Sequence, residues 1–174
     1  MSNYDGAPLN TNNRPGTSSV STDQHLPEKI RNLDLGAIKF KLLYEDSEVD
    51  WSEKRVDEVE AEYRRFLALA DEGNGRPTSP SRNIDVFWHQ HILDTEKYYN
   101  DMMLVFGHMM HHFPYLGSRS EEDQELLYEA YRDTRKRYLD KFGELPREDV
   151  WGLMAHCGSS HCSGNTGGDG SGGN

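Results

Sequence analysis

Apolar residues recur at spacings of three and four through the middle of this chain, and that spacing constrains the fold more than any other feature. It is typical of helices that bury one stripe, whereas no segment alternates apolar and polar residues over the length of a convincing strand. Four helices are predicted, over residues 26–44, 50–70, 83–106 and 120–142. The sequence therefore predicts an all-α fold, an irregular bundle of about four main helices.

Local start and stop signals support several of these boundaries. Residues 72–80 are rich in glycine and proline and form a loop that no regular element could cross. The third helix stops at Gly107, and the fourth runs from a cap at Ser120 to Gly143. Gly36 weakens the middle of the first helix, which is nevertheless predicted as one element.

The two ends of the chain differ from the middle in composition. Both are dominated by small polar residues and glycine, which offer little apolar surface to bury. We therefore expect a disordered N-terminal tail over residues 1–24, one helical domain over 25–156, and a flexible tail rich in Gly, Ser and Cys over 157–174. A chain of 174 residues has room for one core.

The net charge of −11 argues against general binding to nucleic acids or membrane surfaces, because it would repel their phosphate groups. No apolar run is long enough to span a bilayer, and the N-terminus lacks the basic region and apolar core of a secretory signal. The sequence thus favours a cytoplasmic protein whose partner is an unknown protein or small molecule.

The chemically informative segment is the histidine-rich stretch from Asp85 to Pro114. Its groups able to bind a metal are His89, His91, His108, His111, His112, Asp85 and Asp94. Imidazole nitrogens and carboxylate oxygens are the ligands that zinc, iron and manganese prefer. The segment therefore predicts a site for a divalent transition metal, namely zinc, iron or manganese.

Helical geometry sorts these residues. At about 100° per residue, Asp85 and His89 lie on one side of a regular helix and form a chelating pair. His91 lies roughly 160° from His89, so a straight helix cannot bring both imidazoles to one ion. Either the backbone is irregular there and His91 is a further ligand, or His91 has a different role, such as a proton shuttle.

A more distant ligand is expected from the turn after Gly107. His111 and His112 both lie on it, and physical reasoning does not rank one above the other. A site formed by Asp85, His89 and one of these histidines would leave a coordination position open, as catalytic metal sites do. The secondary candidates for this site are His111, Asp94, Trp88 and Tyr98.

Two interpretations without a metal stay open for the same segment. Asp85 and His89 could be a buried hydrogen-bonded pair that pins the helix to the following loop. They could also belong to an acid/base site that needs no ion. Trp88, Tyr98 and Tyr99 fit the hydrophobic core better than a cofactor site.

A second group of candidates lies near the C-terminus. It consists of two His-Cys pairs: His156, Cys157, His161 and Cys162. These residues could hold zinc or copper, but their spacing is not that of a standard zinc knuckle, and the flanking glycines would have to be ordered. A reversible thiol pair, or a tail without chemistry, is favoured for this group.

The central motif reads IDVFWHQHILDTEKYYNDMMLVFGHMMHHFPYLG, and around it lie LDLGAIKFKLL, WSEKRVDEVEAEYRRFLAL and WGLMAHCG. Together these segments, from residue 26 to 174, resemble the glycine-rich domain-containing protein-like family of plants and microbes. Carried onto this chain, the motif of that family falls on Asp85, Trp88, His89, His91, Asp94, Thr95, Tyr98, His112 and Pro114. The resemblance favours His112 over His111 and implies no defined reaction. Plant members are associated with development and stress responses. This chain differs from them in having only a brief glycine tail in place of their longer glycine-rich regions.

Functions from different classes follow as alternatives. The first is a helical domain with an Asp/His metal site, which would make it a candidate metal-dependent enzyme of unknown reaction. The second is a non-enzymatic protein-interaction module in which the same residues form a structural hydrogen-bond network. A third and less favoured function is redox chemistry or metal handling by Cys157 and Cys162. The sequence leaves open whether the protein is an enzyme.

Overall fold

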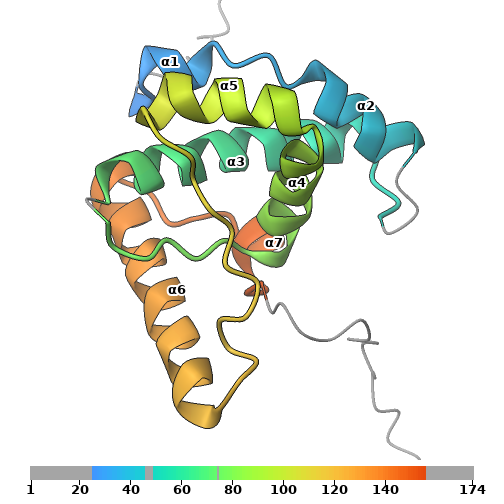
Figure 1. The fold of residues 1–174 in the computed structure, drawn as a ribbon. Helices are drawn as coiled ribbons and strands as arrows, with labels where there is room; N and C mark the ends of the chain where they lie inside the picture. Colours follow the sequence, from blue (N-terminus) through green and yellow to red (C-terminus); the bar gives the residue numbers. More distant parts are fainter. Residues whose placement is uncertain (1–24, 46–48, 74, 156–174) are drawn as a thin grey trace, which may run out of the picture.

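Helices provide the regular structure of this protein (Figure 1). The computed structural model describes residues 25–45, 49–73 and 75–155. Within these ranges there is no strand, and there are seven helices: α1 (Glu28–Arg31), α2 (Gly36–Tyr44), α3 (Glu53–Glu72), α4 (Arg82–Leu93), α5 (Thr95–Phe106), α6 (Glu121–Phe142) and α7 (Glu148–Trp151). The prediction of an all-α fold is confirmed. The predicted tails, residues 1–24 and 157–174, lie outside the described residues.

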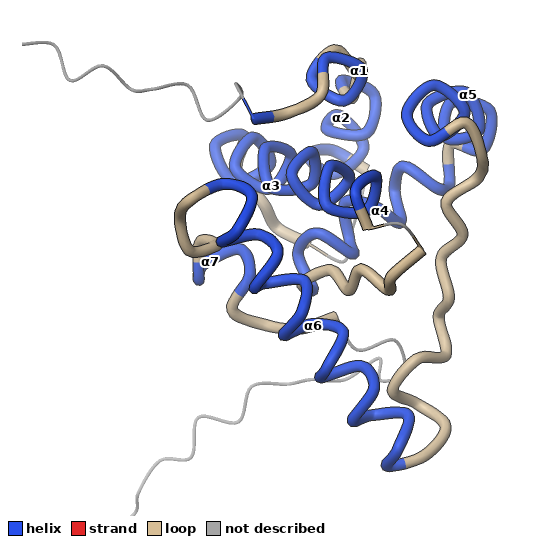
Figure 2. Tube along the Cα trace, turned by 90° about the vertical axis from the view of Figure 1, so that its left-hand side faces the viewer, coloured by secondary structure: helices blue, strands red, loops and turns tan. Residues whose placement is uncertain are grey.

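The central element of the fold is α3. Two perpendicular views show α1 and α2 on one side of it, and α6 and α7 on the other (Figure 1, Figure 2). Along α3, Val59, Phe66 and Leu67 are completely buried, at the helical spacing that the sequence predicts. Burying a side chain of this size stabilises a fold by roughly 1.5–3 kcal/mol, so this stripe holds the surrounding helices together.

The predicted helix over residues 26–44 is wrong in its continuity, because the chain breaks between α1 and α2. Arg64 of α3 donates hydrogen bonds to the carbonyl groups of Ile30 at 2.6 Å and Leu33 at 2.9 Å. A continuing helix would have used these carbonyls for its own backbone bonds. Leu33 and Leu35 both turn into the core at the break, with exposures of 5% and 2%.

The predicted helix over residues 83–106 also divides, into α4 and α5. Asp94 lies between them with φ −84° and ψ 75°, and its side chain caps α5 by accepting a hydrogen bond from the Lys97 N–H at 3.4 Å. The break resets the helical phase. As a result Tyr98 is buried, while Tyr99 is 52% exposed and its assignment to the core is wrong.

Removing the cap should therefore weaken the junction of α4 and α5. We expect Asp94→Ala to lower the free energy of unfolding by about 1 kcal/mol, because the first backbone N–H groups of α5 lose their acceptor. Urea unfolding measures the change. Asp140→Ala, at an exposed position on α6, is the matched control. Equal losses in the two variants would show that Asp94 does not stabilise the break.

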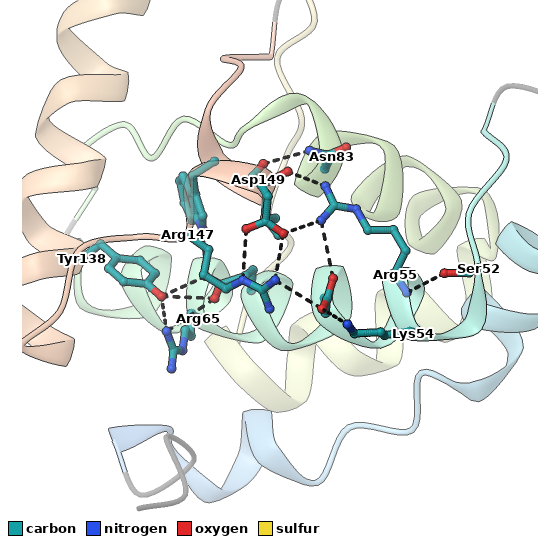
Figure 3. A network of polar contacts seen from close by, with 12 residues as sticks. Ser52, Lys54, Arg55, Arg65, Asn83, Tyr138, Arg147 and Asp149 are labelled. Atoms are coloured by element: carbon teal, nitrogen blue, oxygen red, sulfur yellow. Dashed lines mark hydrogen bonds and ion pairs between the residues drawn. The ribbon is translucent and has the colours of Figure 1, made fainter. Parts of the chain in front are cut away.

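A buried polar network joins α3 to α6 and α7, and Figure 3 shows its Arg65 and Tyr138 side by side. The Glu62 carboxylate accepts hydrogen bonds from Trp151 Nε1 at 2.8 Å and from the Tyr138 hydroxyl at 2.9 Å. Arg65 donates to the same hydroxyl and lies 3.4 Å from Glu62. Because Glu62 and Arg65 are buried, these bonds form away from water and fix α6 and α7 against α3.

The longest helices, α3 and α6, are amphipathic rather than uniformly apolar. On α6 the buried positions include Leu127, Thr134 and Tyr138, while most of its remaining positions carry charged or polar side chains. None of the described helices combines the length and the apolar composition that crossing a bilayer requires.

Candidate metal centre

Three side chains that carry metal-binding atoms meet beside α4. Asp85 and His89 lie one turn apart on this helix, and His112 comes from the segment that joins α5 to α6. One ligand atom of each residue lies within 4.8 Å of the other two. The structure thus brings together three of the predicted site residues, and we refer to Asp85, His89 and His112 as the triad.

The distances within the triad are close to those between ligands of a single ion. The two Nε2 atoms of His89 and His112 lie 3.0 Å apart. His112 Nε2 is 3.1 Å from Asp85 Oδ1, and His89 Nε2 is 3.8 Å from Asp85 Oδ2. Ligand atoms placed about 2.1 Å from an ion lie roughly 3.0–3.4 Å from their neighbours in octahedral or tetrahedral coordination. Two of the three distances lie in or near this range and the third is longer, so the triad could hold an ion after a small adjustment of its side chains.

The triad is buried on one side and open on the other. The side chains of Asp85 and His112 are 12% and 14% exposed, whereas that of His89 is 46% exposed. Two of the three side chains are therefore held in place by the protein around them. The third leaves the site within reach of solvent and small molecules.

Core aromatic residues position the segment that carries His112. The Tyr98 hydroxyl donates a hydrogen bond to the Met110 carbonyl at 2.6 Å and accepts one from Trp88 Nε1 at 2.9 Å. The Trp88 ring packs against the ring of His112, with centroids 4.7 Å apart. Burial raises the pKa of Tyr98 to about 12, so its hydroxyl keeps the proton that it donates. Trp88 and Tyr98 are core residues that hold His112 in place from the buried side of the triad.

The far end of the same segment is anchored by Asp123, in the first turn of α6. Its carboxylate accepts a hydrogen bond from the Gly117 N–H at 2.7 Å and forms an ion pair with Arg119 at 2.5 Å. The hydrogen bond from the Arg119 side chain has the largest effect on the pKa of Asp123, and the backbone N–H groups of Arg119 and Gly117 have smaller ones. Together they lower this pKa to about 2. Gly117 has φ +87°, a backbone conformation that residues with a Cβ rarely adopt, so this turn favours glycine.

We expect Asp123→Asn to speed amide exchange across residues 113–119, since the anchor loses its ion pair. The folded pKa of about 2 lies below the ordinary 3.8, so this anchor contributes fully above pH 3.8 and is lost as the pH falls through about 2. The difference from wild type should persist at about pH 5 and shrink near pH 2. Hydrogen exchange measures it, with Asp140→Asn as the exposed control. Identical exchange of Asp123→Asn and wild type at about pH 5 would refute the anchor.

His91 lies outside the triad, although it is two residues from His89. Its side chain is fully buried, with Nδ1 2.9 Å from the Tyr63 hydroxyl and Nε2 3.0 Å from Asp101. Burial lowers the pKa of His91 and outweighs the opposing effect of the Asp101 carboxylate. The neutral form of the His91 imidazole is therefore favoured. Of the two alternatives that the sequence left open, the structure shows the one in which His89 and His91 have different partners. Asp101 was missed in the sequence analysis because only the turn at Asp94 brings α5 alongside His91.

The remaining predicted site residues lie apart from the triad. Asp94 caps α5, as described above. His111 is exposed and contributes to the wall of a neighbouring cavity. The candidates near the C-terminus lie outside the described residues: His156, Cys157, His161 and Cys162.

The fold and the site together define an all-α domain that carries an Asp/His cluster between a helix and a returning segment. The chain belongs to the UCP032817-like family, whose model matches residues 28–138. That match includes the whole triad. No curated protein and no solved structure matches the chain.

The predicted membership of the glycine-rich domain-containing protein-like family is wrong. The family model that matches is UCP032817-like, and nothing in the comparisons points to a glycine-rich family. The resemblance rested mainly on a run of histidine, aromatic and methionine residues, and such residues recur on helices for reasons of packing alone. The preference for His112 over His111 now rests on the geometry of the triad.

Proposed function

We propose that this protein binds one divalent transition metal ion, zinc, iron or manganese, through Asp85, His89 and His112. The observation that carries the proposal is the convergence of one ligand atom from each residue within 4.8 Å. Two imidazole nitrogens and one carboxylate oxygen form a ligand set that zinc enzymes and non-haem iron enzymes both use. The types of ligand and the distances between them therefore both suit a metal ion.

The facing imidazoles give a second reason to expect a cation. At 3.0 Å, the Nε2 atoms of His89 and His112 can stay together without an ion only if one of them donates a proton to the other. A metal ion would accept both lone pairs at once and would also neutralise the nearby Asp85 carboxylate. A bound cation would thus be contacted by all three groups at once.

The arrangement favours a catalytic site over a structural one. An ion held by three protein ligands supplies Lewis acidity to water or substrate at its remaining positions. The exposed side of the triad, at His89, gives such molecules access. We therefore propose that the domain is a metal-dependent enzyme. Its reaction would depend on which molecule can enter the site.

Elemental analysis of untagged full-length protein tests the metal site. The protein should carry Cys157→Ser and Cys162→Ser, so that thiols near the C-terminus cannot contribute. We expect about one equivalent of zinc, iron or manganese in this background, and a loss of nearly all of it in His89→Ala. His111→Ala removes an exposed histidine of the same segment and should retain the metal.

A protein that purifies without metal and takes up none of the three ions would contradict the proposal. The triad would then be a hydrogen-bonded pin, in which His112 and Asp85, 3.1 Å apart, tie the segment after α5 to α4. In that case the domain would be an interaction module, and the search would turn to protein partners.

A further inference from the structure

A cavity of about 600 Å³ lies next to the triad. Its walls come from the loop between α3 and α4, from the segment that crosses in front of that loop after α5, and from α6 (Figure 1). Asp85 belongs both to this wall and to the triad, and Trp88, which also lines the cavity, packs its ring against the His112 ring. The cavity has the size of small-molecule sites, which span about 300–1,000 Å³.

The wall of the cavity is mainly apolar. Its apolar side chains include Trp88, Phe106, Met109, Met110, Leu116 and Leu127. Methionines adapt their shape to what they contact, so two of them side by side tolerate a flexible apolar chain. The lining therefore favours a ligand with an apolar body.

The charged groups in the wall favour an anion at one end of that ligand. Asp71 is already paired with Lys29 at 2.9 Å. Arg76 is 60% exposed and lies 3.8 Å from Asp133, which is a loose pairing. A divalent ion on Asp85 would more than neutralise that carboxylate, which leaves the wall net positive in a chain of net charge −11.

We propose that the cavity binds a small apolar carboxylate whose charged end lies beside Asp85, the triad residue that lines the cavity. The apolar chain lies against Met109, Met110 and Leu127. This inference rests on the proposed metal site and names the class of molecule that the site admits.

Decanoate and 1-decanol are the probes, because they share an apolar chain and differ in the charged end. Calorimetry follows their binding to the full-length protein with one equivalent of zinc and after chelation. We expect decanoate to bind at least about tenfold more tightly with zinc than without it, because the carboxylate gains a charged partner. Decanol should bind equally in both states.

Variants that fill the cavity separate its role from that of the triad. Ala130→Phe on α6 and Ala70→Leu on α3 both project into it and should lose decanoate and decanol while retaining zinc. Zinc retained in a background with Cys157→Ser and Cys162→Ser also reports that the fold is intact. Ala61→Phe, at an exposed position on α3, is the matched control and should bind both probes as the wild type does.

The outcomes distinguish this inference from the proposed function. A wild type that takes up zinc but binds neither probe overturns the inference alone. Decanoate that binds equally with and without zinc overturns the placement of its carboxylate. A wild type that takes up none of zinc, iron and manganese overturns the proposed function and, with it, the anion site.

Discussion

We expect zinc to raise the free energy of unfolding by about 2.7 kcal/mol when free zinc is about one hundred times the Kd. The triad joins α4 to a segment 23 residues further along the chain, counted from His89 to His112. An unfolded chain does not hold these ligands together, so the free energy of binding adds to that of folding.

Urea unfolding with and without zinc measures this gain. The background with Cys157→Ser and Cys162→Ser is needed because unfolded thiols also bind zinc and would reduce the effect. His112→Ala should abolish the gain, whereas His108→Ala, an exposed histidine outside the triad, should retain it. An equal gain in His112→Ala and wild type would place the zinc elsewhere.

A large loss of stability is expected from Glu62→Ala. The substitution removes the carboxylate that accepts from Trp151 and Tyr138 and that lies beside Arg65. Arg65 is 6% exposed and would keep its hydrogen bond to the Tyr138 hydroxyl and its ion pair with Glu144 at 2.8 Å, whose side chain is 50% exposed. Removing one partner of such a buried pair costs roughly 3–5 kcal/mol, because the other loses its buried counter-charge.

Chemical unfolding followed by tryptophan fluorescence or circular dichroism measures the loss. Glu62→Gln keeps a side-chain acceptor and should lose less than Glu62→Ala. Glu129→Ala, an exposed substitution on α6, should change the free energy of unfolding by less than about 0.5 kcal/mol. If Glu62→Ala behaves like Glu129→Ala, the network does not fix α6 and α7 to α3.

Local signals predicted some helix boundaries well. The last long helix was predicted from Ser120 to Gly143, and α6 has Ser120 as its N-cap and Gly143 as its C-cap. The Ser120 hydroxyl accepts from the Asp123 N–H at 3.2 Å, and Gly143 has φ +71°. Both interactions involve residues within one turn, so the sequence contains them directly.

The two breaks could not be predicted in this way. The gap between α1 and α2 depends on Arg64, which reaches the carbonyls of Ile30 and Leu33 from another helix. Asp94 does signal a cap, but only the tertiary structure shows that α5 starts a new phase and buries Tyr98 rather than Tyr99. A helical pattern read across a break therefore assigns residues to the wrong face.

The sequence by itself determined the all-α class and the pairing of Asp85 with His89, because helical periodicity and a spacing of four residues are properties of local backbone geometry. Only the tertiary structure decided that His112 joins them, that His111 faces a cavity, and that His91 turns to another partner. These outcomes depend on contacts between residues far apart in the chain, such as the bond from the Tyr98 hydroxyl that holds the returning segment. Local spacing carries no information about such contacts.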